Sequence, residues 1–346
     1  MNKDTERGDW GGCNHDSPDD GDPEPDHAQF MSEQATVATL FKIFKELAPN
    51  PQNVDFSDDC AQLSALNSCH SHPTLVTTDA LCEGVHFDLV LDSYDQVGAQ
   101  AAIVNLSDLA SSGAVPRGLL WSLSVPSRIK IDHLRSLAEG FGRTAARYQI
   151  EVVGGNLCSR EGPLEIHVTA FGSAWRTQIG RNGAQAGDRV YLTGTLGSRA
   201  LGYMDPSRYW RAKRHEWRPH INEARILSEW GQVTAMMDIS DGFLIDAERL
   251  GRASRVCLHI NEELLPIDPD VREHPLGREA ALRGGEDYIL LFTAPSSSPP
   301  PEELGAILIG DCSSLDQEQV WLRLDGQAIE CKGYTHLISG QEVEER

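Results

Sequence analysis

The sequence has few basic residues and no long hydrophobic run. Lys and Arg number 30 against 52 Asp and Glu, which gives a formal net charge of −22. A field of this sign repels nucleic acids and anionic membranes, so neither is expected as a partner. No stretch approaches the roughly 18 apolar residues of a membrane-spanning helix, and the first 30 residues are too polar and acidic for a signal peptide. We therefore expect a soluble, cytoplasmic protein.

Several motifs of common enzyme classes are also absent. The eight cysteines are scattered, with no C-x-x-C pair and no Cys/His grouping at zinc spacing, so we expect reduced thiols that are mostly buried. The lack of a G-x-x-x-x-G-K-[ST] loop disfavours a P-loop NTPase. The lack of a G-x-G-x-x-G turn after a strand weakens the case for a dinucleotide-binding domain.

Residues 1–30 form an acidic tail. They combine Asp, Glu, Gly and Pro with almost no aliphatic side chains, a composition that cannot bury a core, so we expect disorder. The spacing of a calcium-binding loop is missing. Met31 could be the true start, because Ser32 is placed to cap a helix whose apolar residues are Leu40, Ile43 and Leu47.

Beyond the tail, alternating strand and helix patterns predict an α+β or α/β protein of two domains. In the first half we expect strands at 75–78, 119–125, from 152 onward and at 164–170, and helices at 93–113 and 131–148. In the second half we expect helices at 197–204, 220–230 and 243–253, and strands at 189–193, 235–239, 256–260, 288–293 and 306–310. The turn-rich stretch 176–188 marks the boundary, which places the domains at 31–176 and 177–346.

Four acidic groups stand at the predicted ends of strands and helices. They are Ser57-Asp58-Asp59, Thr77-Thr78-Asp79, Asn105-Leu106-Ser107-Asp108 and Asp238-Ile239-Ser240-Asp241-Gly242. Taken singly, each is also typical of a turn or a helix cap. Asp79 and Asp108, however, lie where the flanking sequence predicts burial, and a buried carboxylate needs a cation or several hydrogen-bond donors. Because basic residues are scarce nearby and these groups contain no His or Cys, we expect Mg²⁺ and a phosphate-bearing ligand.

The motifs, in this order, resemble those of thiamine-monophosphate kinases, members of the aminoimidazole-ribonucleotide-synthetase-like superfamily. The resemblance covers about residues 33–338, in the segments S-D-D-C-A (57–61), V-T-T-D-A-L-C-E-G-V-H-F (76–87), N-L-S-D-L-A-S-S-G-A-V-P (105–116), G-G-N (154–156), G-R-N-G-A-Q-A-G-D (180–188), D-I-S-D-G-F (238–243) and G-G-E-D-Y-I-L-L-F-T (284–293). It implies a two-domain α+β, synthetase-like fold, with an N-terminal domain that forms a barrel shared in a homodimer and a C-terminal α/β sandwich domain. It also implies ATP-dependent phosphorylation of thiamine monophosphate to thiamine diphosphate with several Mg²⁺ ions.

The resemblance further implies roles for individual residues. The magnesium ligands would be Asp59, Thr77, Thr78, Asp79, Asp108, Asn156, Asp238 and Asp241. The ATP contacts would be Gly155, Asn156, Arg181 and Ser240. The substrate contacts would be His86, Glu286 and Tyr334, with a packing role left open for His86 and Tyr334. Direct in-line transfer is expected without a covalent nucleophile, because a phosphate oxygen is already nucleophilic at neutral pH.

Two positions depart from the family pattern. The family has Gly-Gly-Asp-Thr where this chain has Gly154-Gly155-Asn156-Leu157, so one negative charge is missing from the expected metal ligands. Ser57 replaces a preferred Gly. Asn156 keeps open the alternative of a non-catalytic or substrate-shifted nucleotide-binding paralogue. A selenophosphate synthetase needs a lysine after a Gly-rich cysteine segment, and Gly11-Gly12-Cys13 has no such lysine, which disfavours that function.

Overall fold

The computed structural model describes residues 30–32, 42, 46, 58–63, 72–205, 207–329, 331 and 337–339. The expectations for residues 1–29, for Ser57 and for Tyr334 lie outside the described residues. Of the helix expected beyond Ser32, Lys42 and Glu46 are described and both are helical. Strand β1 (Phe30–Ser32) pairs antiparallel with β14 (Leu337–Ser339), a pairing that the sequence did not predict.

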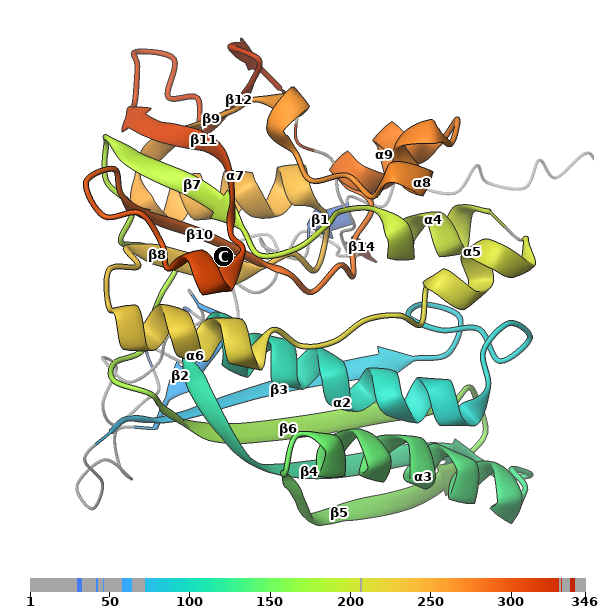
Figure 1. Ribbon diagram of the computed structural model, residues 1–346. Helices are drawn as coiled ribbons and strands as arrows, with labels where there is room; N and C mark the ends of the chain where they lie inside the picture. Colours follow the sequence, from blue (N-terminus) through green and yellow to red (C-terminus); the bar gives the residue numbers. More distant parts are fainter. Residues whose placement is uncertain are drawn as a thin grey trace, which may run out of the picture.

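The first half of the chain forms a five-stranded sheet in the order β2-β3-β6-β4-β5. Its strands are β2 (Ala61–Gln62), β3 (Thr74–Cys82), β4 (Ala114–Pro126), β5 (Glu151–Arg160) and β6 (Glu165–Ala174). The β4–β5 pair is parallel and the other pairs are antiparallel. Within the described part of the chain, both helices of this half lie on one face of the sheet and the other face is uncovered (Figure 1).

Those two helices are α2 (Tyr94–Ser111) and α3 (Ile131–Arg147), which pack against each other. Their backbones approach closely at two glycines: a Cβ at Gly98 would lie 2.0 Å from the Leu137 carbonyl oxygen, and one at Gly140 would lie 1.9 Å from that of Asp95. Any larger residue at either position would push the helices apart.

Helix α2 is apolar on nearly all sides, and the structure shows why. It contacts β3, β4 and β6 of the five-stranded sheet, and it also contacts α6 (Ile221–Trp230) and β8 (Ala235–Asp238) of the second half. A helix enclosed in this way has no solvent face to fill with charged residues. The polar residues that α2 does carry must therefore find partners inside the protein.

The second half forms a seven-stranded sheet in the order β13-β12-β9-β11-β7-β10-β8. Its strands are β7 (Asp188–Leu192), β8, β9 (Val256–Ile260), β10 (Leu290–Pro295), β11 (Ile307–Ser314), β12 (Leu322–Leu324) and β13 (Gln327–Ala328). Helix α7 (Phe243–Ser254) belongs to the larger apolar core of this half, while α6 contributes to a second cluster with Tyr191 and Phe292. Further helices are α4 (Ser198–Met204), α5 (Arg208–Lys213), α8 (Pro269–Glu273) and α9 (Gly277–Arg283), with the 3₁₀ turns η3 (Glu262–Leu264) and η4 (Glu302–Leu304).

The mixed α/β class predicted from the sequence is confirmed. Each strand and helix expected between residues 72 and 314 is present, with ends that differ by a few residues. Short elements such as α5, α8, α9, β12 and β13 were not predicted, because they carry too few residues for a clear periodicity. Across the residues that the structure describes, no helix has both the length and the apolar character needed to cross a membrane.

Candidate active site

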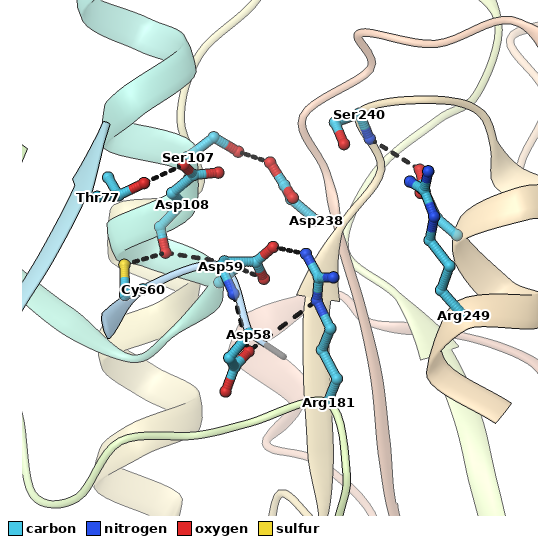
Figure 2. Close-up of polar contacts among 12 residues, drawn as sticks. Asp58, Asp59, Cys60, Thr77, Ser107, Asp108, Arg181, Asp238, Ser240 and Arg249 are labelled. Atoms are coloured by element: carbon cyan, nitrogen blue, oxygen red, sulfur yellow. Dashed lines mark hydrogen bonds and ion pairs between the residues drawn. The ribbon is translucent and has the colours of Figure 1, made fainter. Parts of the chain in front are cut away.

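Three predicted metal ligands, Asp59, Asp108 and Asp238, converge where the two halves meet. Each offers a carboxylate oxygen, and these oxygens all lie within 4.8 Å of one another. Asp59 precedes β2, Asp108 lies near the C-terminal end of α2, and Asp238 ends β8 (Figure 2). We call these three residues the acidic cluster. It joins positions that are up to 179 residues apart in the sequence, from 59 to 238.

A hydroxyl group donates a hydrogen bond to each carboxylate of the acidic cluster. Thr77 Oγ1 donates to Asp108 Oδ2 at 2.6 Å, and Ser111 Oγ donates to Asp59 Oδ2 at 2.8 Å. Ser107 Oγ donates to Asp238 Oδ2, which links α2 to β8. Neutral donors fix the orientation of a carboxylate without cancelling its charge. The acidic cluster is thus held in place and remains in need of a cation.

Among the residues that the structure describes, one basic residue contacts the acidic cluster directly. The Arg181 guanidinium pairs with Asp59, and its Nε lies 4.0 Å from Asp58 Oδ1 (Figure 2). That same Nε is buried and has no hydrogen-bond partner. A single guanidinium can offset only part of the negative charge that three carboxylates bring together.

Burial and mutual repulsion raise the pKa values of the carboxyl groups here. Burial, followed by the charges of Asp79 and Asp238, raises the pKa of Asp108 well above its usual range. Burial and then the charge of Asp238 raise the pKa of Asp79 to about 6. Burial also raises the pKa of Asp238. Such a set of hard oxygen donors, short of positive charge, fits Mg²⁺.

The turn between β8 and α7 carries Ser240 and Asp241. The Asp241 carboxylate pairs with Arg249 of α7, and its charge contributes to the raised pKa of Asp79. The Ser240 backbone N–H donates to Asp246 Oδ2 at 3.0 Å, drawn in Figure 2 as the dashed line that starts at Ser240. Both predicted residues therefore lie beside the acidic cluster, on a turn that the first residues of α7 hold.

Thr78 lies away from the acidic cluster. Successive side chains of a strand point to opposite faces, and on β3 Thr77 and Asp79 face α2 while Thr78 faces outward. Thr78 Oγ1 donates to the Val168 carbonyl oxygen at 2.9 Å. The structure does not bring the Thr78 side chain together with the acidic cluster.

Gly155 and Asn156 are farther away, on the exposed edge strand β5. The register runs from Asp79 to Val168, from Val168 to Trp121 and from Trp121 to Gly155, so three strand steps of roughly 4.8 Å, about 14 Å in all, separate β3 from β5. Asn156 is exposed and pairs with Ser122, next to the inward-facing Trp121, so it shares the uncovered face with Thr78. Within one chain, Asn156 does not reach the acidic cluster.

The two described substrate candidates, His86 and Glu286, lie together. Gln100 Nε2, on α2, donates both to the Glu286 carboxylate and to the His86 carbonyl oxygen, each at 3.2 Å. Arg199 is 3% exposed, and its Nε donates to Glu286 Oε2 at 2.7 Å. The Glu286 N–H donates to the Ser240 carbonyl oxygen at 2.7 Å, which connects these residues to the β8–α7 turn.

Sequence reasoning did not identify several residues that organise the site. On α2 these are Gln100 and Ser111, which lie on the same side of the helix as Asp108. Ser107 was part of a predicted motif, but its role as a hydrogen-bond donor was not predicted. The sequence did contain a signal for these α2 residues, which is the helical spacing of polar residues on an otherwise apolar helix. Arg199, Asp246 and Arg249 gave no comparable signal, because each depends on a contact with a segment distant in the sequence or on a side chain that bends back over its own helix.

The fold and this site define a class of protein. The family model "AIR synthase related protein, N-terminal domain" matches residues 57–174, which are the five-stranded sheet with α2 and α3. The chain is 34% identical to a thiamine-monophosphate kinase of Aquifex aeolicus over 77% of this chain and 89% of the relative. It is 30% identical to that of Bacillus subtilis over 82% and 93%.

A solved structure agrees. AaThiL complexed with AMPPCP and TMP matches with a TM-score of 0.77 and 30% identity, over 88% of this chain and 97% of that one. The chain belongs to the thiamine-monophosphate kinase family, as its motifs indicated, and the prediction that it is a kinase is confirmed.

Proposed function

We propose that this protein phosphorylates thiamine monophosphate with ATP to give thiamine diphosphate, using Mg²⁺. The observation that carries the proposal is the acidic cluster, whose three carboxylate oxygens lie within 4.8 Å of one another in a member of this kinase family. Related AaThiL was solved with AMPPCP, an ATP analogue, and TMP, which supports the same pair of ligands here.

The acidic residues have a binding role in this reaction. Asp59, Asp108 and Asp238, with Thr77, Asp79 and Asp241 beside them, would hold the magnesium ions. Bound Mg²⁺ supplies the positive charge that lets two phosphate groups approach each other. Their hydroxyl donors keep these carboxylates in fixed positions, so little reorganisation is needed when the ligands bind.

Arg181 and Ser240 would contact the ATP phosphates. Arg181 pairs with Asp59 through one terminal nitrogen, and its Nε makes no hydrogen bond, so its planar donor set has capacity for a phosphate oxygen. No general base is required, because the acceptor phosphate of thiamine monophosphate is anionic at neutral pH. Catalysis then rests on positioning and charge compensation.

His86 and Glu286 would position the thiamine part of the substrate, with Tyr334 as a third predicted contact. Glu286 takes hydrogen bonds from Arg199 and Gln100, so its carboxylate is fixed in orientation beside the β8–α7 turn. A carboxylate so placed suits the amino and cationic groups of thiamine. The hydrogen bond from the Glu286 N–H to Ser240 ties this end of the site to the metal ligands.

We further propose two domains, 31–176 and 177–346, and a homodimer formed through the uncovered face and edge of the five-stranded sheet. Strand β5 is exposed along its length, and Leu120, Val153 and Leu157 leave 39%, 52% and 58% of their surface exposed. An unpaired edge strand with apolar side chains favours association with another chain. A second copy packed there would also give Asn156 a site to contribute to. The predicted cytoplasmic location stays a prediction.

Turnover with thiamine monophosphate, ATP and Mg²⁺ tests the proposed function. We expect ADP and thiamine diphosphate in equal amounts, and ADP release that depends on thiamine monophosphate. Asn156 favours a second candidate, a nucleotide-binding paralogue without this activity. Calorimetry that detects ATP binding in a protein with no thiamine diphosphate formation would support that candidate and overturn the first.

A further inference from the structure

Asp246, in the first turn of α7, folds its side chain back over the start of its own helix. The residue is fully buried, at 0% exposure. Its Oδ2 accepts hydrogen bonds from three consecutive backbone N–H groups, those of Ser240 at 3.0 Å, Asp241 at 3.0 Å and Gly242 at 3.2 Å. Its Oδ1 accepts from Arg249 at 2.9 Å. One carboxylate thus fixes the whole segment that connects Asp238 to α7.

These three N–H groups are placed where they could bind an anion if Asp246 did not occupy them. They lie at the N-terminus of α7, where backbone N–H groups lack helical partners and the helix dipole favours negative charge. Consecutive N–H groups in such a turn commonly hold phosphate. Here the carboxylate of the chain itself fills the place, so the turn offers its side chains, and not these backbone groups, to a ligand.

The rest of the turn adapts to this arrangement. Gly242 has φ +127°, which L side chains rarely adopt, and a Cβ there would lie 2.7 Å from the Arg283 carbonyl oxygen. Arg249 completes the arrangement, since it pairs with Asp246 and with Asp241 together. Burying a carboxylate next to another acidic residue costs free energy unless donors and a cation compensate it. Asp246 has both, from the turn and from Arg249.

We propose that Asp246 is a positioning residue that holds the 238–242 turn in the conformation in which Asp238 and Asp241 bind magnesium. The inference rests on the proposed function, in which both residues are metal ligands. An amide in its place keeps one acceptor oxygen but loses the negative charge that attracts the three N–H groups and Arg249, so Asp238 and Asp241 are held less firmly. Residues that orient metal ligands in this way typically change metal affinity about 10- to 100-fold when mutated.

The experiment compares Asp246→Asn with Asp188→Asn. Asp188 is a matched control, because it is 5% exposed and accepts from the Gln185 N–H at 2.9 Å and from Thr234 Oγ1 at 2.7 Å, away from the acidic cluster. Mg²⁺ binding is measured by calorimetry without nucleotide, and backbone exchange at 240–242 by hydrogen–deuterium exchange. For Asp246→Asn we expect Mg²⁺ affinity to fall about tenfold and exchange at 240–242 to quicken. Asp188→Asn should lower the melting temperature without either effect.

Unchanged Mg²⁺ affinity in a folded Asp246→Asn protein would overturn the inference and leave Asp246 a purely structural role. Should that variant fail to fold, backbone exchange at 240–242 in the wild-type protein without Mg²⁺ is the second measurement: it should already be slow, because Asp246 holds these N–H groups before the metal binds. Rapid exchange there without Mg²⁺ would contradict the inference. Failure of the proposed function is a separate result: a wild-type protein that binds no Mg²⁺.

Discussion

At the residue scale, the acidic cluster is unfavourable without its ligand. Asp59, Asp108 and Asp238 place carboxylate oxygens within 4.8 Å of one another, and three hydroxyl donors orient them without adding positive charge. Close like charges in a shielded place destabilise the folded state. A cation bound as proposed would offset this repulsion and would let a strongly acidic chain accept two phosphate-bearing ligands.

Asp108→Asn tests this balance. We expect turnover to fall at least about a hundredfold, because compensation of charge on the transferring phosphate is impaired. The melting temperature without Mg²⁺ should stay equal or rise, because the amide cannot ionise at a place where burial and the neighbouring carboxylates oppose the charged form. Turnover and thermal unfolding are measured beside Asp132→Asn, a control on α3 whose side chain is 76% exposed. Wild-type turnover in Asp108→Asn contradicts the assignment.

Asn156→Asp tests the departure from the family. A carboxylate binds Mg²⁺ more strongly than an amide oxygen does, so we expect the Mg²⁺ midpoint of turnover to fall about tenfold, equivalent to about 1.4 kcal/mol. Asn261→Asp, at the start of η3, adds the same charge elsewhere and should leave the midpoint unchanged. If Asn156→Asp does not lower the midpoint, Asn156 does not contribute to metal binding in the assembled protein.

At the scale of elements, helix α2 carries residues of both parts of the site. Its apolar side chains fill the space between the two halves, while Gln100, Ser107, Asp108 and Ser111 make the polar contacts described above. Because the helix is enclosed, each of these four side chains has a partner on another segment of the chain. The same helix therefore positions both a proposed metal ligand and the proposed substrate contacts.

The sequence predicted features that depend on neighbouring residues, and it missed features that depend on residues far apart along the chain. Strand and helix periodicities predicted the elements, and period-two alternation along β3 could have separated Thr78 from Asp79. Motif resemblance named Asp59, Asp108 and Asp238. Strand order is not encoded locally, so nothing in the sequence alone placed Asn156 three strands from β3. Asp246 and Arg199 act through other residues, and their importance emerges only from three-dimensional contacts.

A half-buried carboxylate that contacts Gly197, the residue before α4, predicts a pH effect on stability. The two carboxylate oxygens of Asp287 share the Gly197 N–H, at 3.0 and 3.1 Å, and burial raises the pKa of Asp287 from 3.8 to about 8. The folded state thus holds this proton more tightly than the unfolded state does. Its contribution to stability is full below about pH 4 and is lost as the pH rises through 8.

Asp287→Asn should therefore flatten the decline in melting temperature between pH 6 and pH 8.5, since the amide keeps an acceptor for Gly197 and does not ionise. Thermal unfolding of both proteins across this range is the measurement. Asp205→Asn is the control, because hydrogen bonding lowers the pKa of Asp205 and that residue stays ionised over the same range. Parallel curves for wild type and Asp287→Asn would contradict the predicted titration.

At the scale of the whole molecule, the two faces of the five-stranded sheet differ sharply. One face is covered by α2 and α3 and holds Asp79, while the other exposes Leu120 and carries Thr78 and Asn156 (Figure 1). The resemblance assigns metal or nucleotide roles to residues of both faces. The proposed second copy of the chain, packed on the uncovered face, would reconcile the two sets, because it would give Asn156 surroundings that one chain does not supply.

Leu120→Glu tests this arrangement. A charge in the proposed interface, buried without a partner, should dissociate the dimer, so sedimentation velocity should show the mass fall from two chains to one. Leu308→Glu is the matched control, since Leu308 is 40% exposed against 39% for Leu120 and lies on β11 of the other sheet. We expect the control to stay dimeric. The Leu120→Glu protein should lose turnover when it dissociates into single chains. A wild-type protein that sediments as one chain at full activity would contradict the dimer and leave Asn156 outside the site. A dissociated Leu120→Glu chain with wild-type turnover would show that one chain holds a complete site.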